Sequence, residues 1–271
     1  KEMGLDPARG FRARERYALD EINRWSPQVL QFKSSGPFCP PGVDQSYVLA
    51  NMRALFWSWP LNAAVAAAHG DIMEKFNVGS AVSVHLRRGD VAARLNNLPR
   101  RGDSAQDWAK AVRKSFDKLA IRFAPISAYL DAIAALDGNP PLIVYSDDDD
   151  VRQAVANNAT DRVIDIQSAL DAHDLFPAQR AFVELLVMSE TRAIIGMESG
   201  FSLVPSLIGA TPYIHVFDYL NVSNVLEMLR QSTTGHPDQD ALLPLLVAQF
   251  AEIMDVYDRK TLADEMRSVR F

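Results

Sequence analysis

The sequence predicts an α/β protein built on a Rossmann-like, doubly wound parallel sheet, and two observations lead to this prediction. From residue 81 to about residue 220, short apolar runs typical of buried strands alternate with segments of helical length. Polar clusters directly follow three of these strands, where open α/β sheets bind their ligands. We therefore divide the chain into a mostly helical N-terminal segment (1–80), a Rossmann-like domain (81–220) and C-terminal helices packed on the fold (221–271).

Each element follows from a local pattern. In the strand at 82–87, valine and leucine alternate with polar residues, so that His85 and Arg87 share one face. Ser104 is a suitable N-cap for a helix at 105–123. The remaining strands are expected at 142–145, 163–166, 193–196 and 213–216, and the remaining helices at 61–76, 125–136, 151–157, 178–190 and 201–208.

Composition excludes several classes of protein. With 271 residues, 48% of them hydrophobic, the chain can bury a large core, and its net charge of −6 argues against general nucleic-acid binding. No apolar run has the length of a membrane span. Cys39 is the single cysteine, which excludes an internal disulfide framework and fits a reducing compartment. We expect a cytoplasmic bacterial protein, although a chain that starts at Lys1 leaves a missing leader or anchor open.

The first polar cluster ends the strand at 82–87. His85, Arg87 and Arg88 are costly to desolvate unless they meet an anion or a carboxylate, and Gly89 allows the sharp turn that Asp90 closes. One interpretation is a phosphate-type site at the strand end. The other is an internal ion pair of Arg87 or Arg88 with Asp90 that fixes the turn. The residues alone favour neither.

The second cluster is the acidic run of residues 147–150. Paired carboxylates can hold Mg²⁺ or Mn²⁺ beside a diphosphate. The alternative, which we favour for Asp149 and Asp150, is that the run caps the following helix, because acidic side chains are stabilised at the positive helix end. Asp147 lies closest to the strand end and could accept hydrogen bonds from ligand hydroxyls.

The third cluster, Ser199-Gly200-Phe201-Ser202, opens a predicted helix. Backbone amides at a helix N-terminus bind phosphate, and Gly200 permits a close approach. An ordinary capped turn has the same sequence pattern, so both interpretations stay open.

Glu184 lies within an apolar helical run, where a carboxylate needs a partner. It either extends out of the helix to solvent or accepts paired hydrogen bonds from a ligand, and spacing alone favours the first alternative.

The segment from His85 to Asp90 resembles the first motif of the α1,2-, α1,6- and protein O-fucosyltransferase superfamily. The segments 123–129, 144–148 and 184–202 resemble later motifs of the same superfamily, in the same order. The similarity extends over residues 82–209, and the relatives that it suggests are rhizobial nodulation fucosyltransferases and the eukaryotic α1,6 enzymes.

The resemblance implies a GT-B fold whose C-terminal half binds GDP-fucose, and transfer with inversion and without a metal. Arg87 matches the arginine that holds the β-phosphate, and His85 matches a residue near the guanine. Glu184 stands where the family usually has an aspartate that binds guanine. Asp147 and Asp148 match the second motif, whereas Ser199 and Gly200 match a pair that is commonly Ser-Ser.

Two departures from the family pattern concern the acceptor side. The N-terminal segment (1–80) is interpreted as a reduced or truncated acceptor half. The loop at 91–99 contains no carboxylate where some relatives have a candidate base, which leaves Asp90 and Asp103 as the nearby carboxylates.

Together these patterns predict an inverting glycosyltransferase that transfers fucose from GDP-fucose to a glycan or other hydroxyl acceptor. Arg87 and Asp90 are the expected catalytic residues, and no cofactor or metal is expected. The expected donor-binding residues are His85, Arg87, Arg88, Asp147, Asp148, Glu184, Ser199, Gly200, Phe201 and Ser202.

Two alternatives stay open: a glycosyltransferase with another nucleotide sugar and a metal at Asp147, and a nucleotide- or glycan-binding domain without turnover. The acceptor, the linkage and the oligomeric state are not predicted.

Overall fold

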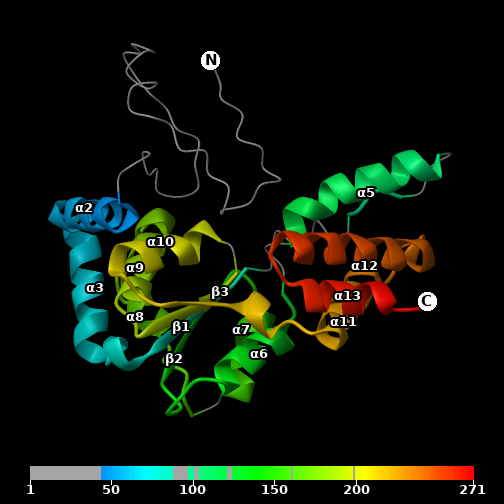
Figure 1. The fold of residues 1–271 in the computed structure, drawn as a ribbon. Helices are drawn as coiled ribbons and strands as arrows, with labels where there is room; N and C mark the ends of the chain where they lie inside the picture. Colours follow the sequence, from blue (N-terminus) through cyan, green and yellow to red (C-terminus); the bar gives the residue numbers. More distant parts are fainter. Residues whose placement is uncertain (1–43, 88–96, 101–103, 121–123, 160, 198) are drawn as a thin grey trace. The chain divides into compact units, whose positions relative to one another are not determined.

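The structure is a computed structural model that describes residues 44–87, 97–100, 104–120, 124–159, 161–197 and 199–271 (Figure 1). The chain forms two units, residues 1–60 and 61–271, and each is described by itself. The described part of the first unit is helix α2 (Gln45–Ser58) with its flanking residues. Asp44 caps this helix, because its carboxylate accepts hydrogen bonds from the amides of Ser46 (2.6 Å) and Tyr47 (3.4 Å).

The second unit contains a four-stranded sheet in which all paired strands are parallel. The strand order is β2-β1-β3-β4, with β1 (Val82–Leu86), β2 (Leu142–Ser146), β3 (Ala193–Gly196) and β4 (Tyr213–His215). Every residue of β1 is buried, as expected for a central strand covered on both faces. These strands confirm the predicted α/β fold with a parallel sheet.

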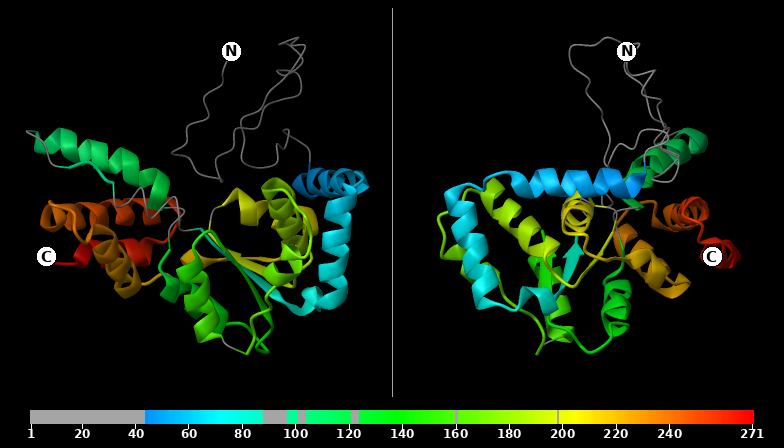
Figure 2. Two further views of the ribbon diagram at one scale, coloured as in Figure 1. Left: turned by 180° about the vertical axis from the view of Figure 1, so that it is seen from behind. Right: turned by 60° about the vertical axis from the view of Figure 1, so that its left-hand side comes forward.

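Helices cover both faces of this sheet (Figures 1 and 2). Contacts between α6 and α7 place these two helices together, and α9 and α10 pack together on the opposite face. Helix α3 forms a further layer against α8 and α9. The bounds of these helices are α3 (Ala63–Lys75), α6 (Ile126–Ala134), α7 (Asp149–Asn158), α8 (Gln167–Asp171), α9 (Pro177–Ser189) and α10 (Gly200–Gly209).

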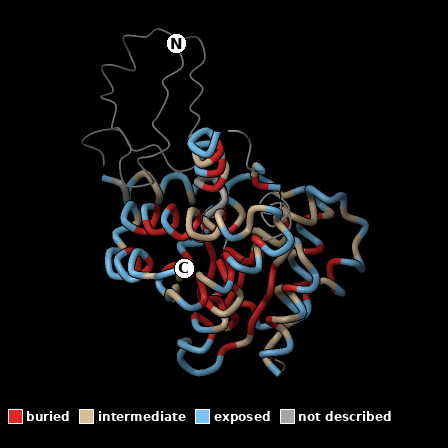
Figure 3. The backbone as a smooth tube through the Cα atoms, turned by 90° about the vertical axis from the view of Figure 1, so that its right-hand side faces the viewer, coloured by how far each residue is buried: buried red, intermediate tan, exposed pale blue. Residues whose placement is uncertain are grey.

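The two faces of β1 differ in chemistry, as the alternating sequence predicts. Val82, Val84 and Leu86 belong to the main hydrophobic core, which also contains residues of α6 and of the C-terminal helices. Ser83 lies on the other face, where its hydroxyl accepts a hydrogen bond from Thr191 Oγ1 (3.1 Å), and His85 lies there beside α10. Figure 3 shows these buried strands in the interior, beneath helices whose outer sides are exposed. The site described below therefore lies on the polar face.

Four helices form a separate layer beyond the sheet. Helix α12 packs against α5, α11 and α13, and the rings of Phe116 and Phe250 lie 6.4 Å apart between α5 and α12. The Ser104 hydroxyl accepts a hydrogen bond from the Asp107 amide (3.2 Å) and so caps α5, as predicted. The bounds are α5 (Ala105–Ala120), α11 (Val222–Thr233), α12 (Gln239–Val256) and α13 (Lys260–Ser268), with short 3₁₀ helices at Val78–Ser80 and Val216–Tyr219.

The strand predicted at residues 163–166 is wrong. Val163 forms one isolated parallel bridge with Leu142, and the chain then leaves the sheet. The chain turns at Asp165, whose carboxylate accepts a hydrogen bond from the Gln167 amide (2.9 Å), and α8 begins at Gln167 with Ile166 as its N-cap. Apolar content alone suggested a strand, whereas this local turn directs the chain into a helix.

Within the described ranges, no helix combines the length and the apolar character needed to cross a membrane.

Candidate functional site

The strand order identifies one place on the sheet where a ligand is expected. The chain passes from β1 outward to β2 on one side and from β3 outward to β4 on the other. The neighbouring strands β1 and β3 therefore flank the topological switch point, and ligands of open α/β sheets bind outside the carboxyl ends of such strands. His85 and Arg87 end β1 at this place, and the start of α10 follows β3.

His85 is a buried side chain at the switch point. The Tyr129 hydroxyl donates a hydrogen bond to its backbone carbonyl (3.2 Å) and holds the strand end. The imidazole lies against the ring of Phe201, with the centroids 5.3 Å apart. Within the described part of the chain, His85 Nδ1 is buried and has no hydrogen-bond partner. A buried, unsatisfied polar atom is uncommon and marks a position where a ligand can supply the partner.

Burial also determines the charge of His85. It lowers the pKa of the imidazole to about 4, with a smaller contribution from the Arg87 cation in the same direction and an opposing one from Asp147. The side chain is therefore neutral at pH 7, with one ring nitrogen as donor and the other as acceptor. These influences also show that Arg87 and Asp147 both lie near His85.

Arg87 and Asp147 meet at this edge because their strands are in register. Leu86 pairs with Ser146, so the residues that follow, Arg87 and Asp147, lie level with each other. Arg87 is partly exposed and Asp147 is exposed. A cation and a carboxylate thus lie side by side at the strand ends. Two further predicted residues of this cluster, Arg88 and Asp90, lie outside the described residues.

The acidic run caps helix α7, but the capping residue is Asp148, and Asp149 and Asp150, for which the sequence favoured this role, lie in the first turn of the helix. Its carboxylate accepts hydrogen bonds from the amides of Asp150 (3.1 Å) and Val151 (3.2 Å). Asp149 forms an ion pair with Arg152 (2.7 Å). Among the described residues, no group of three or more His, Cys, Asp or Glu side chains is arranged to hold a metal ion.

The predicted helix after β3 is α10, and its start combines a cap with open space. The Ser199 hydroxyl accepts a hydrogen bond from the Phe201 amide (3.3 Å). A methyl group added at Gly200 would meet no described atom within 4 Å, so the space beside this residue is open. The amides of Ser199 and Ser202 also have partners, the carbonyls of Met197 and Ser199, so Gly200 carries the amide of this turn that a ligand could bind. The positive end of the α10 dipole and the Gly200 amide therefore lie beside His85.

Ser202 has a different environment from its three neighbours. It is fully buried, and its hydroxyl contacts the Met197 carbonyl (3.3 Å) and the Tyr213 hydroxyl (3.0 Å). It holds α10 against β3 and β4.

Glu184 lies half-buried on α9, and its Oε1 accepts a hydrogen bond from Gln167 Nε2 (3.2 Å). Burial raises the pKa of Glu184, whereas this hydrogen bond and the cations Arg180 and Arg152 oppose the rise. The pKa of Tyr145 is raised by burial and by the charge of Glu184. Because Tyr145 pairs with His85, Glu184 lies on the same polar face as the switch point. The partner Gln167 was not predicted, since no local pattern connects residues on two different helices.

Comparison of the chain with protein-family models, with curated proteins and with solved structures found no match.

Proposed function

We propose that this sheet edge binds the diphosphate of a nucleotide sugar, and that the protein is an inverting glycosyltransferase with GDP-fucose as its donor. The observation that carries the proposal is the meeting, at the switch point, of Arg87, the N-terminus of α10 and His85, whose Nδ1 has no hydrogen-bond partner among the described residues. The choice of GDP-fucose depends on the resemblance of the motif at residues 85–90 to fucosyltransferases.

The chemistry follows from where charge develops. As the bond between the sugar and the diphosphate breaks, negative charge grows on the leaving phosphate. Arg87, the Gly200 amide and the positive end of the α10 dipole would stabilise that charge, and such preorganised groups contribute several kcal/mol to lowering a barrier. Arg88 would add a second cation. Inversion requires an acceptor hydroxyl to attack from the face opposite the diphosphate, and Asp90 is the candidate carboxylate that accepts its proton.

The base would be selected by Glu184. Guanine presents an N–H and an NH₂ group side by side, which a carboxylate can accept together. Adenine and cytosine place an acceptor beside their amino group, and uracil flanks its N–H with two carbonyls. A carboxylate on the polar face therefore favours guanine over the other bases.

Isothermal titration calorimetry with GDP, UDP, ADP and CDP tests the proposal. We expect GDP to bind most tightly, and equal or tighter binding of UDP contradicts the fucosyltransferase interpretation. Turnover is measured separately, as GDP release from GDP-fucose with candidate acceptors. GDP binding without any turnover would support a nucleotide-binding domain instead.

A further inference from the structure

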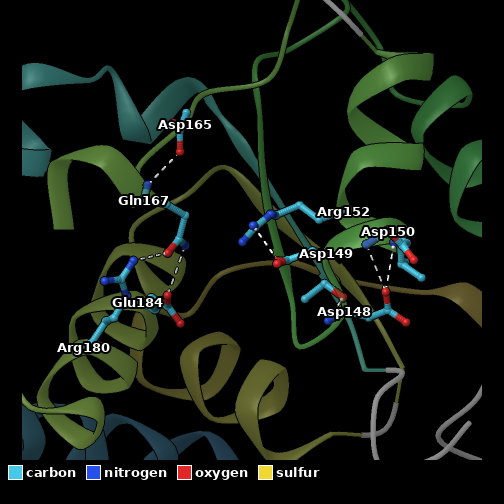
Figure 4. A network of polar contacts seen from close by, with 10 residues as sticks. Asp148, Asp149, Asp150, Arg152, Asp165, Gln167, Arg180 and Glu184 are labelled. Carbon is cyan, nitrogen blue, oxygen red and sulfur yellow. Dashed lines mark hydrogen bonds and ion pairs between the residues drawn. The ribbon is translucent and has the colours of Figure 1, made fainter. Parts of the chain in front are cut away.

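We infer that Gln167 is a positioning residue for Glu184, and that Arg180 sets the direction of its side-chain amide. The inference rests on the proposed function and adds to it a residue that controls base selectivity. Figure 4 shows the three side chains on α8 and α9, joined by hydrogen bonds.

The direction of the amide follows from hydrogen-bond chemistry. Arg180 donates a hydrogen bond to Gln167 Oε1 (2.6 Å), and a guanidinium can only donate. The amide oxygen of Gln167 must therefore face Arg180, which leaves its NH₂ group to donate to Glu184 Oε1 (3.2 Å). A glutamine amide free to flip could present either end, and here it presents the donor. Glu184 is accordingly held as an acceptor.

Both ends of this chain of hydrogen bonds are anchored. The backbone amide of Gln167 donates to the Asp165 carboxylate (2.9 Å), which fixes the first turn of α8 (Figure 4). Arg180 also forms an ion pair with Asp171 (2.5 Å). Gln167 is thus held at its backbone by Asp165 and at its side chain by Arg180. The Gln167 hydrogen bond is made at Glu184 Oε1, and under the proposed function Oε2 accepts one of the two hydrogen bonds from guanine.

The burial of Glu184 explains why a hydrogen-bond donor is needed beside its carboxylate. Burial favours the protonated form of Glu184, and a protonated carboxyl group presents one donor where a guanine needs two acceptors. The Gln167 hydrogen bond favours the ionised form, which matches the ligand. Among the described residues, the helices packed against α9 add no other charge near Glu184. Helix α10 carries no ionisable side chain, and on α3 His69 pairs with Glu190 and Asp71 pairs with His173. The charged or titratable groups that influence Glu184, or that are influenced by it, are Arg180, Arg152 and Tyr145, with Asp171 paired to Arg180.

The test compares Gln167→Leu with a matched control, Gln231→Leu. Gln231 also donates a side-chain hydrogen bond to a glutamate, Glu227 Oε1 at 3.2 Å, but on the exposed surface of α11. The ligands are GDP and inosine diphosphate, which lacks the 2-amino group. We expect wild-type protein to prefer GDP by about tenfold, the usual effect of one hydrogen bond to a charged group. Gln167→Leu should bring the ratio of the GDP and inosine diphosphate affinities close to one, and Gln231→Leu should leave this ratio unchanged.

A second measurement needs no ligand. The pKa of Glu184 is followed by carboxyl carbon NMR, and we expect it to rise in Gln167→Leu and to stay at the wild-type value in Gln231→Leu. Gln167→Glu places an anion beside Glu184 and should raise that pKa as well. If Gln167→Leu does not fold, Gln167→Met, which has the same length and no branch, takes its place in both measurements.

Two outcomes separate this inference from the proposed function. If folded Gln167 variants keep both the wild-type preference and the wild-type pKa of Glu184, the positioning role is wrong. If wild-type protein binds no GDP, the proposed function is wrong, and the NMR measurement still decides whether Gln167 controls the ionisation of Glu184.

Discussion

The imidazole of His85 and the ring of Phe201 lie 5.3 Å apart, with their planes inclined by 39°. This contact joins the end of β1 to the first turn of α10, on the two sides of the switch point. The groups that we propose for the diphosphate, Arg87 and the Gly200 amide at the start of α10, are therefore held on one packed unit. A substitution on either side should change ligand affinity more than it changes the fold.

Arg87→Lys should reduce turnover by at least about a hundredfold, which corresponds to about 2.7 kcal/mol of transition-state stabilisation. A lysine keeps the charge but loses the planar fork that binds two phosphate oxygens. Turnover, GDP affinity and Tm are measured together. The control is Arg162→Lys, because Arg162 lies at the opposite end of β2, where its carbonyl accepts from the Leu142 amide. Near-normal GDP affinity with a lowered Tm would instead assign Arg87 to an internal ion pair.

Nucleotide binding and turnover should persist in EDTA. The prediction follows from the acidic run, in which Asp148 caps α7 and Asp149 pairs with Arg152, so that two of its carboxylates have other roles. In the proposed site, Arg87 would supply the positive charge that a diphosphate needs. Calorimetry and turnover assays are run with EDTA and again with added Mn²⁺. Loss of both activities in EDTA and recovery with Mn²⁺ would make Asp147 the leading metal ligand.

The free energy of unfolding should fall as the pH drops from about 6.5 to about 4. Burial lowers the pKa of both His85 and His215 to about 4 in the folded protein, whereas the unfolded chain binds these protons near pH 6.5. Proton binding to these two histidines therefore favours the unfolded state between about pH 6.5 and about pH 4. Outside this window the two groups cause no further change in the free energy of unfolding. For His85 the full effect is on the order of 3 kcal/mol.

Urea unfolding across pH 4–8 measures this dependence. His85→Gln and His215→Gln should each reduce the slope between pH 6.5 and 4, and the double variant should reduce it most. An unchanged slope in all three variants would mean that neither imidazole is held neutral by burial.

Two glycines of α10 should respond differently to alanine. A Cβ at Gly209 would lie 1.9 Å from the Ser189 carbonyl oxygen at the end of α9, so Gly209→Ala should lower the free energy of unfolding by about 2 kcal/mol. Gly200 has open space, so Gly200→Ala should fold normally and weaken GDP binding by about tenfold, since its methyl group enters the proposed phosphate site. Chemical denaturation and calorimetry on both variants check this. Equal stability of the two would contradict the close contact of α10 with α9.

The sequence by itself determined the elements whose signals are local. The alternation at 82–86 predicted β1, and Ser104 and the acidic run predicted helix starts at α5 and α7, because a cap acts within a few residues of its own position. The wrong strand prediction at 163–166 also came from a local signal. An apolar run suggests a strand, but after one bridge the chain turns at Asp165, whose carboxylate accepts a hydrogen bond from the Gln167 amide.

Tertiary structure alone decided which strand ends are neighbours. The polar clusters were visible in the chain, but only the order β2-β1-β3-β4 places the end of β1 beside that of β3 and makes this the switch point. The partner of Glu184 was likewise decided by packing, since Gln167 reaches it from another helix. Periodicity and capping are properties of short segments, whereas strand order and contacts between helices depend on how the whole core is buried.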